Sequence, residues 1–124
     1  MKDVLFVYGT LMRNGRANTI LRMMRSEFLG EARLDGYSMY DLGPFPGIAP
    51  DPDGSVRGEA WRVSERCLKL VDGYEGVDNR LYERRLEEAE TDTFGKVKAW
   101  VYAYCRPTEG LKKVPAGQAW IREE

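Results

Sequence analysis

The sequence contains no histidine, and its two cysteines are Cys67 and Cys105. Without histidine, the chain lacks the usual zinc ligand and the usual partner of a serine or cysteine nucleophile. The two cysteines fit no C-x-x-C spacing, and this predicts buried free thiols rather than a disulfide framework. Zinc chemistry and histidine-assisted nucleophilic catalysis are therefore not expected.

The chain also lacks an excess of charge of one sign and any long apolar run. It has 19 Lys and Arg against 20 Asp and Glu, a formal net charge of -1. No basic surplus is present to neutralise nucleic acid or an anionic membrane. No apolar run approaches the roughly 20 residues that span a bilayer, and the start is too short for a secretory signal. We expect a cytoplasmic protein without nucleic-acid or membrane partners; its oligomeric state is unknown from the sequence.

Nucleotide and calcium motifs are missing as well. The chain has neither G-x-G-x-x-G nor a phosphate loop that ends in Gly-Lys-Ser/Thr. The segment Asp51–Gly54 begins like a calcium loop, but the twelfth position counted from Asp51 is Arg62, where a bidentate Glu is needed. The segment is interpreted as a turn, and neither a cofactor nor a metal is expected.

The periodicity of the chain predicts one domain over residues 1–124 with an α+β fold. An amphipathic helix is expected from its N-cap Asn18 through Phe28, and a second one from its N-cap Ser64 to Gly76. About five to six strands form a small, mostly antiparallel sheet that curls toward a barrel, with the helices packed against it. The expected strands are Val4–Tyr8, Gly30–Leu42, Val56–Val63, Tyr82–Glu90 and Lys96–Tyr104, with a rigid loop at Gly43–Gly47 and hairpin turns at Asp51–Gly54 and Thr91–Gly95.

Glu75 is a candidate general base. It follows Leu68 by seven residues and Val71 by four, which places a carboxylate on the apolar stripe of its helix. Desolvation there would raise its pKa toward neutrality and make it a useful base. In the alternative, an irregularity at Gly73 turns Glu75 to the surface, where it only ends the helix.

The turn Tyr8–Leu11 is a candidate anion-binding loop. Gly9 directly follows the first strand, so successive backbone N–H groups can point into open space and hold a carboxylate or an oxyanion. A plain strand-ending turn explains the same residues. A base together with an anion site suits intramolecular chemistry, because a substrate that carries its own nucleophile needs only folding and deprotonation.

Two ordered segments resemble the gamma-glutamyl cyclotransferase superfamily in its short AIG2-like branch, which includes gamma-glutamylamine cyclotransferase. The first is Val7–Leu11 with Gly15 and Asn18. The second is Val71–Gly76, followed by Leu81–Arg84, and Arg57–Trp61 fits an element between the two. The residues Val71-Asp72-Gly73 depart from the commoner Leu-Asp-aromatic or Leu-Asp-Ala but leave the glutamate in place.

The resemblance implies a mixed barrel, a pocket at the end of the first strand and a cofactor-free reaction on a small gamma-glutamyl substrate. In that reaction Glu75 takes a proton from the substrate α-amino group, which attacks the gamma carbonyl to give 5-oxoproline and a free amine. The resemblance also implies that Tyr8, Gly9, Thr10 and Leu11 hold the substrate and that Tyr82 walls the pocket. Arg84 is expected to brace the fold through an ion pair, and Asn18 to cap its helix. A different gamma-glutamyl acceptor, or a non-catalytic metabolite-binding or adaptor domain with the same pocket, remains an alternative.

Overall fold

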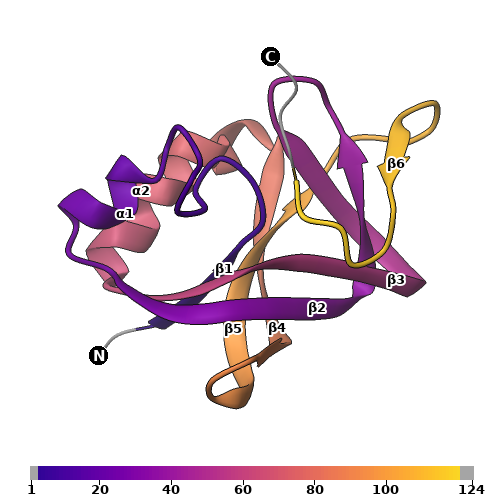
Figure 1. The fold of residues 1–124 in the computed structure, drawn as a ribbon. Coiled ribbons are helices and arrows are strands. Elements are labelled where there is room, and N and C mark those ends of the chain that lie inside the picture. Colours follow the sequence, from indigo (N-terminus) through magenta and orange to yellow (C-terminus); the bar gives the residue numbers. More distant parts are fainter. Residues whose placement is uncertain (1–2, 121–124) are drawn as a thin grey trace.

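The structure is a computed structural model that describes residues 3–120. Six strands, two α-helices and one 3-10 helix follow one another along this part of the chain (Figure 1). In order they are β1 (Asp3–Val7), α1 (Thr19–Met23), β2 (Glu27–Asp41), β3 (Pro46–Val63), α2 (Glu65–Glu75), η1 (Val77–Asn79), β4 (Tyr82–Thr91), β5 (Gly95–Tyr104) and β6 (Lys112–Val114).

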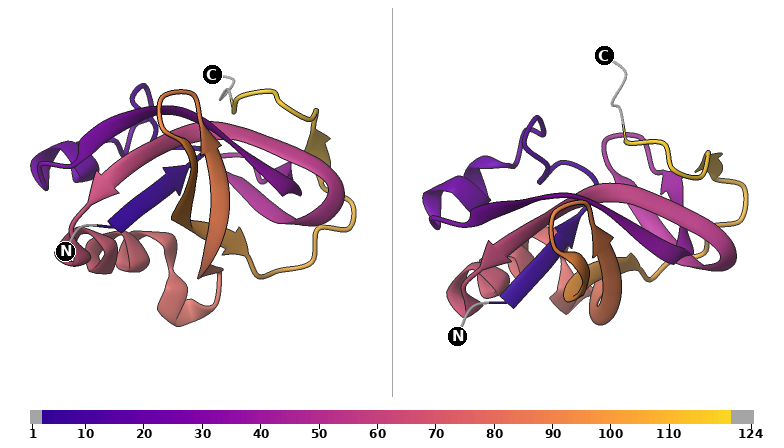
Figure 2. Two further views of the ribbon diagram at one scale, coloured as in Figure 1. Left: turned by 90° about the horizontal axis from the view of Figure 1, so that it is seen from below. Right: turned by 60° about the horizontal axis from the view of Figure 1, so that its bottom comes forward.

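The strands form one mixed sheet in the order β3-β1-β5-β4-β2-β6, in which only the β1–β5 pairing is parallel. The α+β class and the mostly antiparallel mixed sheet are confirmed. The sheet curls strongly, because β2 also pairs with β3, and the β4–β5 hairpin runs across the long β2–β3 ribbon (Figure 2). The sheet curls toward a barrel, as predicted, but it is not a closed barrel. The β2–β4 contact has only two residue pairs, Ala32 with Thr91 and Arg33 with Glu90, and the curl is therefore held by few bonds there.

The first strand lies in the middle of this sheet and is covered on both faces. Leu5 and Phe6 are fully buried and Val7 is 3% exposed. Leu5 and Val7 pack toward the helices, whereas Phe6 packs into the other core cluster, between the curled strands. The short apolar run is therefore a central strand, as predicted. The turn Tyr8–Leu11 follows directly after its last residue, Val7.

The first helix is much shorter than predicted. It spans Thr19–Met23, and Arg25 at φ 57° then turns the chain in the left-handed region. Phe28, predicted on the apolar face of this helix, lies in β2 and packs edge-on against Trp61 at a ring distance of 5.4 Å. The 3.6-residue spacing was misleading because the apolar side chains after Met24 belong to strand β2, and the packing of the sheet buries them.

The turn predicted at Asp51–Gly54 is not a chain reversal. Strand β3 runs through it without interruption, and the hairpin turn between β2 and β3 lies at residues 42–45. The two strands change register here, since Tyr37 pairs with Pro50 and Asp35 with Ser55. The Asp53 N–H donates to Asp51 Oδ1 at 3.1 Å, which is the bond of an Asx turn. This local turn forms a large bulge within β3 and does not end the strand.

The second helix begins and ends where the sequence indicates. Ser64 accepts a hydrogen bond from the Cys67 N–H at 3.1 Å, and Gly76 ends the helix at φ 71°. Both α-helices lie at the same end of the sheet (Figure 1), and Leu21 of α1 shares a core cluster with Leu68 and Val71 of α2. The two helices therefore pack against the face of β1 that carries Leu5 and Val7.

The prediction of two buried thiols is partly wrong. Cys67 is buried as expected, but Cys105 is exposed, although both thiols are free. Near the end of the described residues, β6 joins the sheet edge beside β2. Trp120 packs against both core clusters.

Candidate active site

A pocket of about 220 Å³ lies where the turn after β1 meets the end of α2. It contains every residue that the sequence singled out for the site, and these residues come from three separate stretches of chain. The lining residues are Phe6, Val7, Tyr8, Gly9, Thr10, Leu11, Arg16, Phe45, Pro46, Tyr74, Glu75, Leu81, Tyr82 and Tyr102. Pockets for drug-sized ligands run from about 300 to 1,000 Å³, so this one fits a smaller metabolite.

Among residues 3–120, Glu75 is the only one with a carboxylate that lines the pocket. The helix α2 continues without a break through Gly73, so Glu75 stays on the face of the buried Val71 rather than turning to the surface. Its side chain is half-buried, and burial raises its pKa from 4.5 to about 7. A carboxyl group with this pKa can both take up and release a proton at neutral pH.

The turn opposite Glu75 presents unused backbone donors. Within residues 3–120, no protein group accepts a hydrogen bond from the backbone N–H of Gly9, Thr10 or Leu11. Gly9 is required by close packing here, because a Cβ at this position would lie 2.7 Å from Cγ of Pro46. Pro46 therefore packs directly against the backbone at Gly9. A turn whose successive N–H groups have no protein acceptor can hold an anion.

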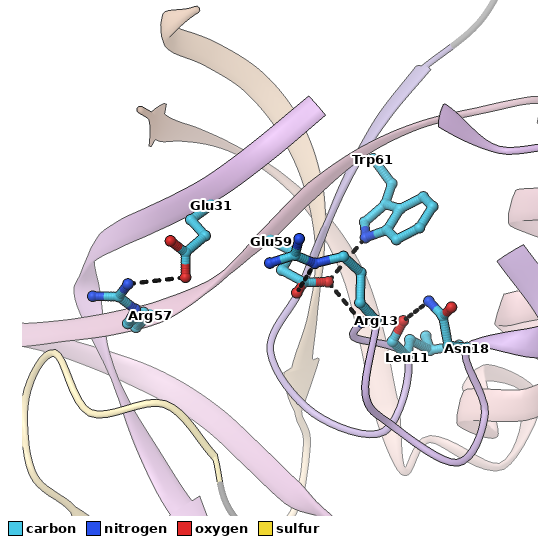
Figure 3. A network of polar contacts seen from close by, with 7 residues as sticks. All are labelled: Leu11, Arg13, Asn18, Glu31, Arg57, Glu59 and Trp61. Atoms are coloured by element: carbon cyan, nitrogen blue, oxygen red, sulfur yellow. Dashed lines mark hydrogen bonds and ion pairs between the residues drawn. The ribbon is translucent and has the colours of Figure 1, made fainter. Parts of the chain in front are cut away.

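Three bonds behind the turn fix its shape. The Ala17 N–H donates to the Thr10 carbonyl at 2.9 Å, and the Met12 N–H donates to the Gly9 carbonyl at 3.1 Å. The Asn18 side chain donates from Nδ2 to the Leu11 carbonyl at 2.8 Å (Figure 3). Asn18 was predicted to cap α1, but its side chain makes no capping bond. Its amide is committed to the turn instead.

Three of the tyrosines that line the pocket also hold it to the sheet. The Tyr8 hydroxyl donates to the Tyr102 carbonyl and the Tyr82 hydroxyl to the Pro46 carbonyl, each at 2.6 Å, and the Tyr102 hydroxyl donates to Asp72 Oδ1 at 2.7 Å. Burial raises the pKa of all three well above 10, so they stay neutral at physiological pH. Because each proton is already donated to the protein, these hydroxyls brace the pocket.

Arg84 forms the structural ion pair that was predicted for it. Its Nε lies 3.2 Å from Asp72 Oδ1, and its guanidinium lies 4.6 Å from the ring centroid of Trp100. Asp72 also accepts the Tyr102 hydroxyl, so this carboxylate joins the end of α2 to both β4 and β5. The helix turn that carries Glu75 is thereby attached to the sheet.

Several pocket residues were missed by the sequence reasoning. Tyr74 and Leu81 lie inside the two segments that carry the family resemblance but were given no role, while Phe45 and Pro46 lie in the loop that was interpreted only as rigid. Tyr102 had a usable signal, since the face of β5 opposite Ala99, Val101 and Ala103 carries aromatic side chains, as expected of a second covered face. Arg16 had no signal, because its approach to the pocket depends on how the loop folds.

In residues 3–120, no helix is long and apolar enough to cross a membrane. Likewise, the described residues include no cluster of three or more Cys, Asp or Glu side chains that could hold a metal ion.

Solved structures with this fold are known. An AIG2-like protein from mouse superposes with a TM-score of 0.82 at 21% identity and covers 97% of this chain and 88% of its own. The solution structure of YtfP from Escherichia coli has a TM-score of 0.71 at 35% identity and covers 92% of this chain and 93% of its own. The first of these likenesses shows the fold alone.

Sequence comparison gives the family. The profile of "Gamma-glutamyl cyclotransferase, AIG2-like" matches residues 5–122. The chain is 34% identical over 117 residues to the gamma-glutamylcyclotransferase family protein YtfP of Escherichia coli K12, covering 94% of this chain and 95% of that protein. It is 30% identical over 104 residues to the "Putative gamma-glutamylcyclotransferase MJ1514" of Methanocaldococcus jannaschii, covering 82% of this chain and 84% of that protein. The chain belongs to the AIG2-like gamma-glutamyl cyclotransferase family.

Proposed function

We propose that the protein converts a small gamma-glutamyl compound into 5-oxoproline and a free amine without a cofactor. The observation that carries this proposal is the shared pocket of Glu75 and the turn Gly9–Leu11. The pocket combines one carboxyl group of near-neutral pKa with three unused N–H donors, and family membership supports the gamma-glutamyl substrate class.

Glu75 acts as the general base in this proposal. As the substrate α-amino nitrogen forms a bond to the gamma carbonyl carbon, Glu75 takes a proton from that nitrogen. The protonated Glu75 then gives the proton to the leaving nitrogen as the old amide bond breaks. Proton and electron pairs balance without an outside acid, and a pKa of about 7 suits both directions of transfer.

The N–H groups of Gly9, Thr10 and Leu11 bind the negative charge. They hold either the carboxylate of the glutamyl end or the oxyanion that develops at the gamma carbonyl. Preorganised backbone donors are worth most at a developing oxyanion, because they require no reorganisation at the moment of reaction. Tyr82, with Tyr8 beside it, closes the wall of the pocket and keeps the short substrate folded for attack.

The test is a screen of gamma-glutamyl amino acids, gamma-glutamyl amines and gamma-glutamyl peptides for 5-oxoproline formation, read by mass spectrometry. We expect at least one compound to give 5-oxoproline and its amine in equal amounts, with the same rate in EDTA. Binding of 5-oxoproline by calorimetry without turnover of any compound would instead favour a non-catalytic metabolite-binding domain.

A further inference from the structure

A buried carboxylate behind the turn has no part in the reaction described so far. Glu59 lies in β3, is only 6% exposed, and pairs across the sheet with Val7, the last residue of β1. Its position places the carboxyl group beside the point where β1 becomes the turn Gly9–Arg13, and Glu59 is not among the residues that line the pocket.

Three N–H groups satisfy this carboxylate (Figure 3). Oε1 accepts from the backbone N–H of Arg13 at 2.9 Å and from the Trp61 indole at 3.2 Å, and Oε2 accepts from Arg13 Nε at 3.0 Å. The Arg13 guanidinium also lies 4.0 Å from the ring centroid of Phe28. A buried carboxylate needs such partners to offset its loss of water.

Of these bonds, the one to the backbone of Arg13 bears directly on the site. Arg13 follows Leu11 by two residues, so the bond fixes the far end of the segment whose free N–H groups line the pocket. The bond from Asn18 to the Leu11 carbonyl holds the same segment from the other side (Figure 3). The two bonds restrain the peptide units on either side of Met12, which directly follow the segment Gly9–Leu11.

We propose that Glu59 is a positioning residue that holds the turn Gly9–Arg13 in the conformation that presents its N–H groups to the substrate. Its effect on the rate rests on the proposed function, whereas its effect on the turn does not. Glu59 does not touch the substrate and acts through the Arg13 backbone.

The structure offers a matched control on the same two strands. Glu31 pairs directly with Glu59 between β2 and β3 and forms an ion pair with Arg57 at 2.9 Å. Figure 3 shows this pair beside Glu59 and not bonded to it. Both side chains of the pair are about half exposed, and neither residue is among those that line the pocket. Glu31→Gln therefore removes a neighbouring carboxylate from the same sheet without releasing the turn.

The experiment compares Glu59→Met, Glu59→Gln and Glu31→Gln at a temperature where circular dichroism shows each protein folded. Met keeps the volume but accepts from neither Arg13 nor Trp61, and replacement of a buried charge by an apolar side chain is often tolerated. We expect kcat per folded molecule to fall about tenfold to hundredfold in Glu59→Met. Glu59→Gln keeps one acceptor and should be intermediate, and Arg13→Ala, which keeps the backbone N–H, should lose less than Glu59→Met.

Amide hydrogen exchange tests the turn independently of any activity. In Glu59→Met we expect faster exchange at Met12 and Ala17, whose acceptors are the carbonyls of Gly9 and Thr10, with unchanged exchange in the β4–β5 hairpin. Unchanged exchange at Met12 and Ala17, or a wild-type kcat in folded Glu59→Met, would overturn the proposal. If the wild-type protein turns over no gamma-glutamyl compound, the proposed function fails and the exchange rates alone decide the role of Glu59.

Discussion

The hydroxyl groups of Thr10 and Tyr74 lie 2.7 Å apart and share a hydrogen bond across the pocket. Thr10 belongs to the turn that presents the N–H groups, and Tyr74 directly precedes Glu75 in α2. This bond joins the two halves of the candidate site, which are 64 residues apart in the sequence.

Breaking this bond should weaken catalysis without abolishing it. A hydrogen bond of this kind contributes on the order of 1 kcal/mol, so we expect Tyr74→Phe and Thr10→Val each to lower kcat/KM by roughly twofold to tenfold. Steady-state kinetics of the two single variants and the double variant form a cycle. The double variant should lose little more than either single one, and fully additive losses would show that the two hydroxyls do not act together.

Two glycines, Gly9 in the turn after β1 and Gly73 in α2, should respond to alanine in opposite ways. Gly9→Ala places a methyl group 2.7 Å from Pro46 Cγ, so we expect about 1–3 kcal/mol of destabilisation and a loss of turnover. Gly73→Ala meets nothing within 4 Å in the helix α2 and should stabilise the protein by about 0.5–1 kcal/mol. Urea unfolding of both variants measures these changes. Equal effects of the two substitutions would contradict the close packing of Gly9 against Pro46.

Neither thiol should be needed for the reaction. Cys67 is buried beside Ser26, Cys105 is exposed, and neither lines the pocket. Burial raises the pKa of the Cys67 thiol, and partial desolvation together with the nearby Glu83 carboxylate raises the pKa of the Cys105 thiol. Both shifts lower the fraction of reactive thiolate. We expect Cys67→Ser and Cys105→Ser each to keep most of the wild-type kcat in a 5-oxoproline assay. Loss of turnover in either folded variant would reopen the question of a cysteine nucleophile.

The sequence predicted the pocket residues that depend on local chemistry. Gly9 after an apolar strand and Glu75 on a helix stripe are visible in a short window, and the family resemblance connected them. The roles of Asn18 and Arg16 depend on the path of the loop between β1 and α1, which short-range periodicity does not encode. The same limit explains Phe28, whose spacing fits a helix but whose burial against Trp61 is provided by the β2–β3 pairing.

Turnover and stability should depend on pH in opposite directions. Glu75 must be ionised to accept a proton, so kcat/KM should rise with pH through an apparent pKa of about 7. Burial raises this pKa from 4.5, and the folded state therefore binds more protons than the unfolded state between pH 4.5 and 7. The contribution of Glu75 to stability falls across this window as pH rises.

The variant Glu75→Gln has no such titration. Its melting temperature relative to wild type should therefore increase from pH 4.5 to pH 8, as measured by calorimetry. A difference that stays constant over this range would show that Glu75 titrates near its ordinary value.

The most direct measurement is the turnover number of Glu75→Gln with the best gamma-glutamyl substrate from the screen, at pH 8. The amide keeps the size and shape of the side chain but cannot accept a proton, and a positioned base contributes on the order of a hundredfold to ten-thousandfold. We expect kcat to fall by at least a hundredfold, with the fold retained and the melting temperature unchanged or higher. A folded Glu75→Gln protein that forms 5-oxoproline at the wild-type rate would show that Glu75 is not the base.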